Sequence, residues 1–124
     1  MKFAIYQIRL TDAEIDLINE KGHDAVAKQS LKIKMDMDFS GDKIASLASI
    51  AMDEGYYTHV ANIEANDYNQ VFEIGNIGPE QNIERLARMH SISVGDVIIS
   101  QEGQLVVVAP VGFVAFGFRP KMAA

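Results

Sequence analysis

A run of oxygen-bearing side chains near residue 40 has the spacing at which a calcium loop begins. Asp36, Asp38 and Ser40 would supply the ligands at loop positions 1, 3 and 5, and Gly41 falls at position 6. The loop also needs a bidentate Glu at position 12, where this chain has Leu47. We therefore interpret these side chains as exposed acids on a strand followed by a helix cap, and we predict no metal site.

The three histidines, His23, His59 and His90, are the next candidates for chemistry. None stands at metal-ligand spacing from another, and there is no H-E-x-x-H motif. His90 directly precedes Ser91, but side chains adjacent in sequence usually diverge and do not form a catalytic dyad. Cysteine is absent, which excludes disulfides, thiolate catalysis and Cys-based zinc sites. We predict no catalytic residue, no cofactor and no enzymatic activity.

A G-x-x-G sequence, Gly75 to Gly78, has the form that clamps a nucleic-acid backbone in some RNA-binding modules. Such modules need basic surroundings, whereas Glu73 and Glu80 flank this one. We interpret the motif as the end of a helix, followed by a new helix that begins at Pro79.

Tyrosines gather in one part of the chain, where Tyr56, Tyr57 and Tyr68 lie near His59. Tyrosine is enriched at protein interfaces because it offers a large contact area with a polar tip. These four residues are our candidate interaction surface. Simple packing within the fold is the alternative that the sequence leaves open.

The composition indicates one soluble globular domain. The chain has 124 residues, of which 48% are hydrophobic, and a formal net charge of −6. The basic residues are scattered, so a nucleic-acid partner is not expected. No stretch reaches the roughly 18 apolar residues of a membrane helix, and the start of the chain lacks the pattern of a signal peptide. We expect a cytoplasmic protein without membrane contact, folded as a single α+β domain over residues 1–124.

The first half of the chain alternates between the strand and helix periods. We predict strands at 2–9, 31–39 and 56–63, and helices from Thr11 to about Glu20 and from a cap at Ser40 or Asp42 to Gly55. Residues 2–9 are apolar on both faces, which is typical of a central strand.

The second half is expected to be mostly strand. We predict a helix from Asp67 to Ile74 that ends at Gly75, a second helix from Pro79, and strands at 94–100, 104–110 and 111–118. A tight turn at 101–103 joins the first two of these strands. The predicted fold is therefore α+β, with a mixed or mostly antiparallel sheet of five to six strands, two to four helices and a C-terminal three-stranded antiparallel meander.

Residues 56–116 resemble the YodL-like domain, a poorly characterised module of phage and plasmid proteins. The resemblance is carried by the stretches 57–64, 71–76 and 90–98 and by a terminal Gly-Phe pair. Its most specific residues, which we expect to be structural, are His90, Ser91, Ser93, Gly95, Asp96, Gly112 and Phe113. Residues 1–55 lie outside the resemblance and are where we expect the particular function.

The resemblance implies a mobile genetic element as the setting, and small proteins there often act by binding another protein. Our leading hypothesis is a non-enzymatic protein-interaction module whose partner is a host or phage protein. Inhibition of a host defence system, of the antirestriction or anti-CRISPR type, is one form that this could take. A nucleic-acid-associated accessory protein is the alternative, and a small enzyme or ligand-binding domain with a pocket near His59 and His90 is the second. A homodimer is also expected if the strand at 31–39 forms an open edge.

Overall fold

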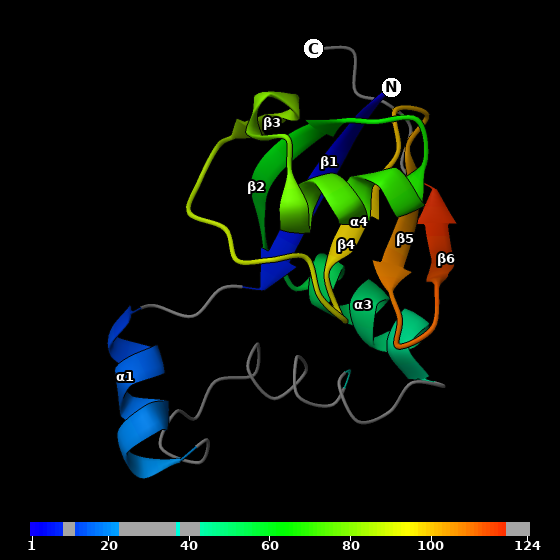
Figure 1. Cartoon of the computed structure of the whole chain (residues 1–124). Coiled ribbons are helices and arrows are strands. Elements are labelled where there is room, and N and C mark those ends of the chain that lie inside the picture. Colours follow the sequence, from blue (N-terminus) through cyan, green and yellow to red (C-terminus); the bar gives the residue numbers. More distant parts are fainter. Residues whose placement is uncertain (9–11, 23–36, 38–42, 119–124) are drawn as a thin grey trace.

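The computed structural model describes residues 1–8, 12–22, 37 and 43–118 and shows an α+β fold (Figure 1). Its sheet has six strands in the order β3-β2-β1-β4-β5-β6, and every neighbouring pair is antiparallel. The elements are β1 (Lys2–Ile8), α1 (Asp12–Lys21), α3 (Ile44–Asp53), β2 (Tyr57–Glu64), α4 (Tyr68–Ile77), a 3-10 turn (Glu80–Asn82), β3 (Ile83–Arg85), β4 (Val97–Ile99), β5 (Gln104–Val108) and β6 (Phe113–Phe118). The predicted fold class is confirmed, including the C-terminal meander of β4, β5 and β6.

Strand β1 occupies the interior of the sheet, as its apolar residues on both faces predict. It pairs with β2 on one side and with β4 on the other. The register with β2 shifts between Ile5, which pairs with Ala61, and Tyr6, which pairs with His59. Val60 is therefore an extra residue, and it turns into the core beside Ala61, where both side chains are completely buried.

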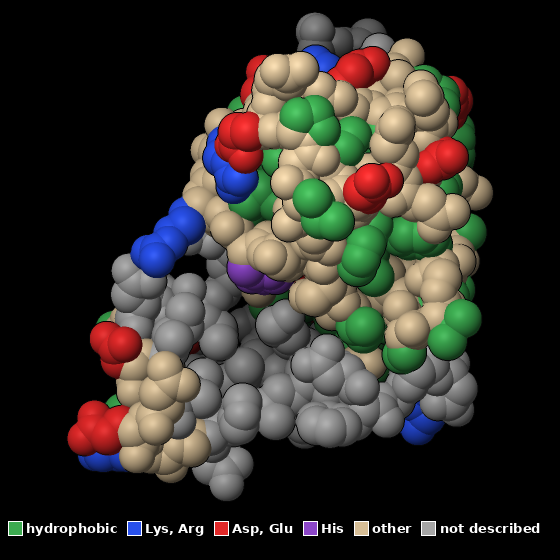
Figure 2. All heavy atoms as spheres, in the orientation of Figure 1, with side chains coloured by type: hydrophobic (Ala, Val, Ile, Leu, Met, Phe, Trp, Pro, Cys, Tyr) green, Lys and Arg blue, Asp and Glu red, His purple; other side chains and the backbone are tan. Residues whose placement is uncertain are grey.

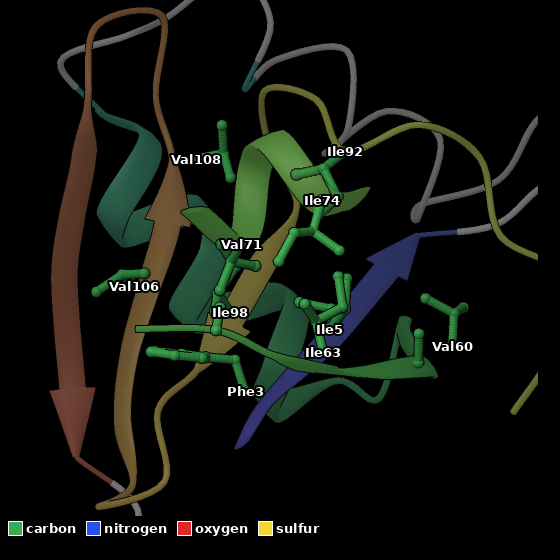
Figure 3. Close-up of a cluster of buried hydrophobic side chains, with 12 residues drawn as sticks. Phe3, Ile5, Val60, Ile63, Val71, Ile74, Ile92, Ile98, Val106 and Val108 are labelled. Atoms are coloured by element: carbon green, nitrogen blue, oxygen red, sulfur yellow. The ribbon is translucent and has the colours of Figure 1, made fainter. Parts of the chain in front are cut away.

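Among the described residues, α4 lies on one face of the sheet and α3 on the other, each over its own buried cluster. The α4-side core joins Val71 and Ile74 of α4 to Phe3, Ile5 and other buried residues of the sheet (Figure 3). The α3-side core lies on the opposite face, where α3 packs on β5 and β6 (Figure 1). Burial on both faces explains why β4 and β5 are almost continuously apolar.

The ends of three helices show which residues fix them. The Asp67 side chain caps α4 by accepting a hydrogen bond from the Gln70 N–H at 2.8 Å. Helix α3 ends as predicted before Gly55, whose φ of 75° favours glycine. Ile44, Ala48 and Ala51 form its buried stripe. Helix α1 also agrees with the prediction, since it ends at Lys21, directly before Gly22.

The prediction for the G-x-x-G region was wrong in two respects. Helix α4 continues through Gly75 and ends at Ile77, with Gly78 as its C-cap. Pro79 begins no α-helix but leads into a single 3-10 turn and then β3. The physical reason is that β2 needs a partner on its outer edge, and β3 supplies the backbone hydrogen bonds that a helix there would leave unmade.

Most of the strand predicted at 31–39 lies outside the described residues, as do Asp36, Asp38, Ser40, Gly41 and Asp42 of the apparent calcium loop. Met37 is described, and its backbone is helical. The strand prediction is therefore wrong at Met37. Its side chain is completely buried in the α3-side core, so burial rather than strand geometry explains why this position is apolar.

Candidate functional site

The two described histidines lie on opposite sides of β1. His59 of β2 stacks on Tyr6, with 4.7 Å between the ring centroids, and its Nε2 lies 2.8 Å from Asn62 Oδ1. The backbone of His90 is held instead by the side chain of Gln7. Because Tyr6 and Gln7 are consecutive residues of a strand, they point to opposite faces. The structure thus does not bring His59 and His90 together around a common pocket.

Gln7 is the centre of a buried polar network. Its Nε2 donates to Asp96 Oδ2 at 3.0 Å and to the His90 carbonyl at 2.9 Å, while its Oε1 accepts from the His90 N–H at 3.1 Å. Asp96 is 1% exposed, and the same Oδ2 accepts from the Ser93 N–H at 2.9 Å. These bonds fix the connection into β4, so the Asp96 side chain has a structural role, to which Ser93 contributes its backbone N–H.

A second side-chain amide fixes the same connection two residues further on. Asn76 accepts from the Ile92 N–H at 2.7 Å and donates to the Ile92 carbonyl at 3.2 Å, as a strand neighbour would. Gly75 lets this segment approach α4 closely, because a Cβ at Gly75 would lie 2.8 Å from Ile92 Cγ1. The 86–96 connection is thereby held between α4 and β1.

Tyr57, one of the four candidate interaction residues, is turned inward. Its hydroxyl donates to the Gly95 carbonyl at 2.6 Å. Burial, together with the nearby Asp96 carboxylate, raises the pKa of this phenol well above its usual value. Gly95 has a φ of 93° and lies in a turn, so the strand predicted at 94–100 begins only at Val97. The phenol therefore stays protonated and serves as a structural donor.

Tyr68 and Phe113 meet at an aromatic cluster on the α4 side. The Tyr68 ring lies 5.4 Å from Phe3 and 5.7 Å from Phe113, centroid to centroid. Its hydroxyl donates to Gln104 Oε1 at 2.7 Å, and burial raises the pKa of the Tyr68 phenol. Phe113 therefore packs against the α4-side core.

The remaining predicted residues are distributed over the surface and the α3-side core. Tyr56 is half-buried against the α3-side core. Ser91 is exposed, and its carbonyl lies 2.8 Å from His90 Nδ1. Gly112 has a φ of 74° in the turn before β6. The four candidate interaction residues do not form one exposed patch.

Hollows on the surface of the described part are shallow and open to solvent. One of about 410 Å³ lies on the sheet between Lys2, Asn62 and Ser100, and neighbouring hollows of about 200 and 230 Å³ are also open. None of the three includes a histidine. Within residues 1–8, 12–22, 37 and 43–118 there is no group of three His, Cys, Asp or Glu side chains able to hold a metal ion.

The outer face of α4 is a feature that the sequence analysis missed. Val71 and Ile74 turn inward, but Phe72 is 38% exposed and Ile77 84% exposed, with the exposed Glu73 between them. Figure 2 shows this side of the molecule, where hydrophobic and acidic side chains alternate, while Lys and Arg lie mainly at the margins of the view. Two large apolar residues at the borders of a helix's polar face were the available signal.

Gln7 and Asn76 were also missed. Gln7 could have been noticed as a polar residue on the apolar face that contains Phe3 and Ile5. Asn76 has no comparable sequence signal, because its partner Ile92 is brought near only by the fold.

Comparison with protein-family models, with curated proteins and with solved structures finds no match to this chain. The resemblance to the YodL-like domain therefore stays a prediction. None of the described helices has the length and hydrophobicity to cross a membrane.

Proposed function

We propose that this chain is a non-enzymatic protein-interaction module of a phage, prophage or plasmid, and that it binds a host or phage protein through the outer face of α4. The observation that carries the proposal is the exposure of Phe72 and Ile77 beside Glu73 on one helix. Inhibition of a host defence complex, of the antirestriction or anti-CRISPR type, is the form of action that the sequence resemblance favours.

The α4 face has the components of a small docking surface. Large apolar side chains supply most of the binding free energy at an interface when a partner covers them. Phe72 and Ile77 lie on either side of Glu73, and the net charge of the chain is −6. The partner surface expected from this chemistry has an apolar centre with Lys or Arg around it, because opposite charges favour encounter and correct orientation.

The fate of the polar groups also supports binding rather than catalysis. Gln7, Asp96 and Tyr57 use their side chains in hydrogen bonds that hold the 86–96 connection and the turn before β4. A catalytic group would have to meet substrate in a cleft. A stoichiometric binder needs only an exposed surface, and the α4 face provides one.

The proposal is tested by affinity capture from a host lysate with the tagged chain, followed by direct measurement with the captured protein. Ile77→Ser and Phe72→Ser should each weaken binding by at least about tenfold, since truncation of a central apolar contact costs about 2 kcal/mol and about 1.4 kcal/mol corresponds to tenfold. Glu73→Lys should weaken binding more at low salt than at high salt.

The matched control is Val111→Ser, which removes an apolar side chain that is 91% exposed but lies outside α4. It should leave binding unchanged. Equal binding by the wild type, Ile77→Ser and Phe72→Ser would overturn the assignment of the surface. Failure to capture any specific partner at physiological salt would overturn the proposed function itself.

A further inference from the structure

The two edges of the sheet differ in how they are protected. β3 forms one edge with only three residues, of which Glu84 and Arg85 are exposed and charged. β6 forms the other edge with six residues, and the chain has no charged side chain between Glu102 and Arg119. Charge and shortness are the usual means by which proteins prevent edge-to-edge pairing. β6 lacks both of these protections.

The hydrogen bonds of β5 show which backbone groups of β6 have no partner among the described residues. The Val108 N–H donates to the Asp96 carbonyl at 2.8 Å, and the Val108 carbonyl accepts from the Gly95 N–H at 2.9 Å. The N–H and carbonyl groups of Val108 thus point toward β4. Because backbone groups alternate in direction along a strand, the preceding residue Val107 directs its own toward β6.

Val107 pairs with Val114, so Val114 uses its N–H and carbonyl within the sheet. Its neighbours Phe113 and Ala115 accordingly direct their N–H and carbonyl groups to the open side. The register between 113 and 115 is regular, and the bulge of β6 lies beyond it, at Phe116. Phe113 to Ala115 is therefore a short segment ready for pairing.

We propose that the β6 edge pairs with β6 of a second copy of this chain, antiparallel and about a two-fold axis at Val114. Phe113 then lies opposite Ala115 of the second copy, and each of the two equivalent pairs exchanges two backbone hydrogen bonds. Val114 lies opposite Val114 of the second copy in a non-hydrogen-bonded pair, with Cα atoms about 4.5 Å apart. The two sheets become one continuous sheet.

A second copy fits this edge better than a charged partner does. Two acidic chains repel each other wherever their charges meet, but this edge brings together only neutral groups. The exposed apolar side chains of β6 and of the turn before it are Val111 at 91%, Val114 at 36% and Phe118 at 66%. They offer no charge for a basic partner to match, and they gain by covering one another. The paired backbone groups belong to β6 and not to α4, so the dimer does not depend on the proposed function.

The first test is the molar mass in solution, measured by light scattering over a dilution series. The wild type should have twice the 13.7 kDa mass of the chain at high concentration and dissociate on dilution, because one strand and a few side chains form a small interface. Val114→Lys places two like charges opposite each other and should give a folded monomer. Leu86→Lys makes the same kind of change at an exposed residue of a different region and should remain dimeric.

The second test uses the absence of cysteine from the chain, which makes every introduced thiol unique. In Val114→Cys, the two thiols face each other at a separation that a disulfide spans, and oxidation by O2 with a copper catalyst should cross-link the copies. Ala115→Cys, whose counterpart in the second copy is Phe113, should cross-link far less.

Several results would overturn the proposal. A wild type that stays monomeric throughout the dilution series would do so. Equal cross-linking of Val114→Cys and Ala115→Cys would refute the two-fold axis at Val114. Dimerisation that survives Val114→Lys would place the interface elsewhere on the molecule.

Discussion

Replacement of Gln7 by Leu should separate the contribution of the buried network from that of ordinary core packing. Leu keeps most of the volume of Gln but offers no hydrogen bond. The substitution removes the donor to Asp96, which is 1% exposed, and both bonds to the His90 backbone. The carboxylate and the two backbone groups of His90 then lose a partner each.

The expected loss follows from these three bonds. A hydrogen bond to a charged group contributes about 2 kcal/mol and a neutral one about 1 kcal/mol. The apolar side chain of Leu returns about 1 kcal/mol by its own burial. Gln7→Leu should therefore lower the free energy of unfolding by about 3 kcal/mol, a large fraction of the stability of a small domain.

The assay is urea unfolding followed by far-ultraviolet circular dichroism. With a denaturant dependence of about 1–3 kcal/mol per molar urea, the midpoint should fall by about 1–3 M with the slope unchanged. Gln81→Leu, at an exposed residue of the 3-10 turn, is the control and should change stability by less than about 0.5 kcal/mol. A loss below about 1 kcal/mol for Gln7→Leu would refute the idea that the network stabilises the fold.

Three further predictions concern single contacts. Asp67→Ala removes the N-cap of α4 and should cost about 1 kcal/mol in thermal or urea unfolding. The pKa of the Tyr57 phenol is raised in the folded state, so the stabilisation that this phenol provides is complete below pH 10 and falls above pH 10 by up to about 1.4 kcal/mol per pH unit. A Tyr57→Phe variant should show a flatter dependence of the unfolding free energy on pH above pH 10. Parallel curves for the two proteins would contradict this. Gly75→Ala should cost about 1–3 kcal/mol because its Cβ would collide with Ile92, and the cost should shrink in an Ile92→Val background; an unchanged cost would exclude this contact as the cause.

The strands were predictable where burial repeats along the backbone. Alternation from Lys2 to Ile8 gave β1 and the faces of its side chains, and the apolar run from Leu105 to Val108 gave an interior strand. In these strands the burial of side chains repeats regularly over several consecutive residues, so the hydrophobic period is enough to predict the strand.

The errors arose where a local signal met a requirement from elsewhere in the chain. Pro79 is a good first residue for a helix, but the segment after it pairs with β2. Gly75 resembles a residue that ends a helix, but it lies within α4. A glycine is needed there because the 86–96 connection passes close to it. Met37 matches a period of two yet is helical. Neighbours far along the chain decided all three conformations, and no local pattern contains them.

The candidate site shows the same limit. The tyrosines and histidines were prominent because their side chains can do chemistry, but the extra residue Val60 in β2 sets where His59 points, and no sequence feature marks that bulge. By contrast, the sequence does contain a signal for the β6 edge, since an uncharged stretch as long as that from Gly103 to Phe118 is unusual at an exposed surface.

The strand order has a consequence for how the chain is made. β1 is synthesised before the other described elements, yet its two neighbours are Tyr57–Glu64 and Val97–Ile99. The pairing of β1 with β4 must therefore wait until most of the domain has been synthesised. Contacts between residues so far apart in sequence raise the contact order of the domain and slow its folding. Until then, the backbone N–H and carbonyl groups on one side of β1 have no strand to pair with. A nascent or truncated chain that stops before Val97 should accordingly be prone to aggregate, whereas the complete chain hides that edge between β2 and β4.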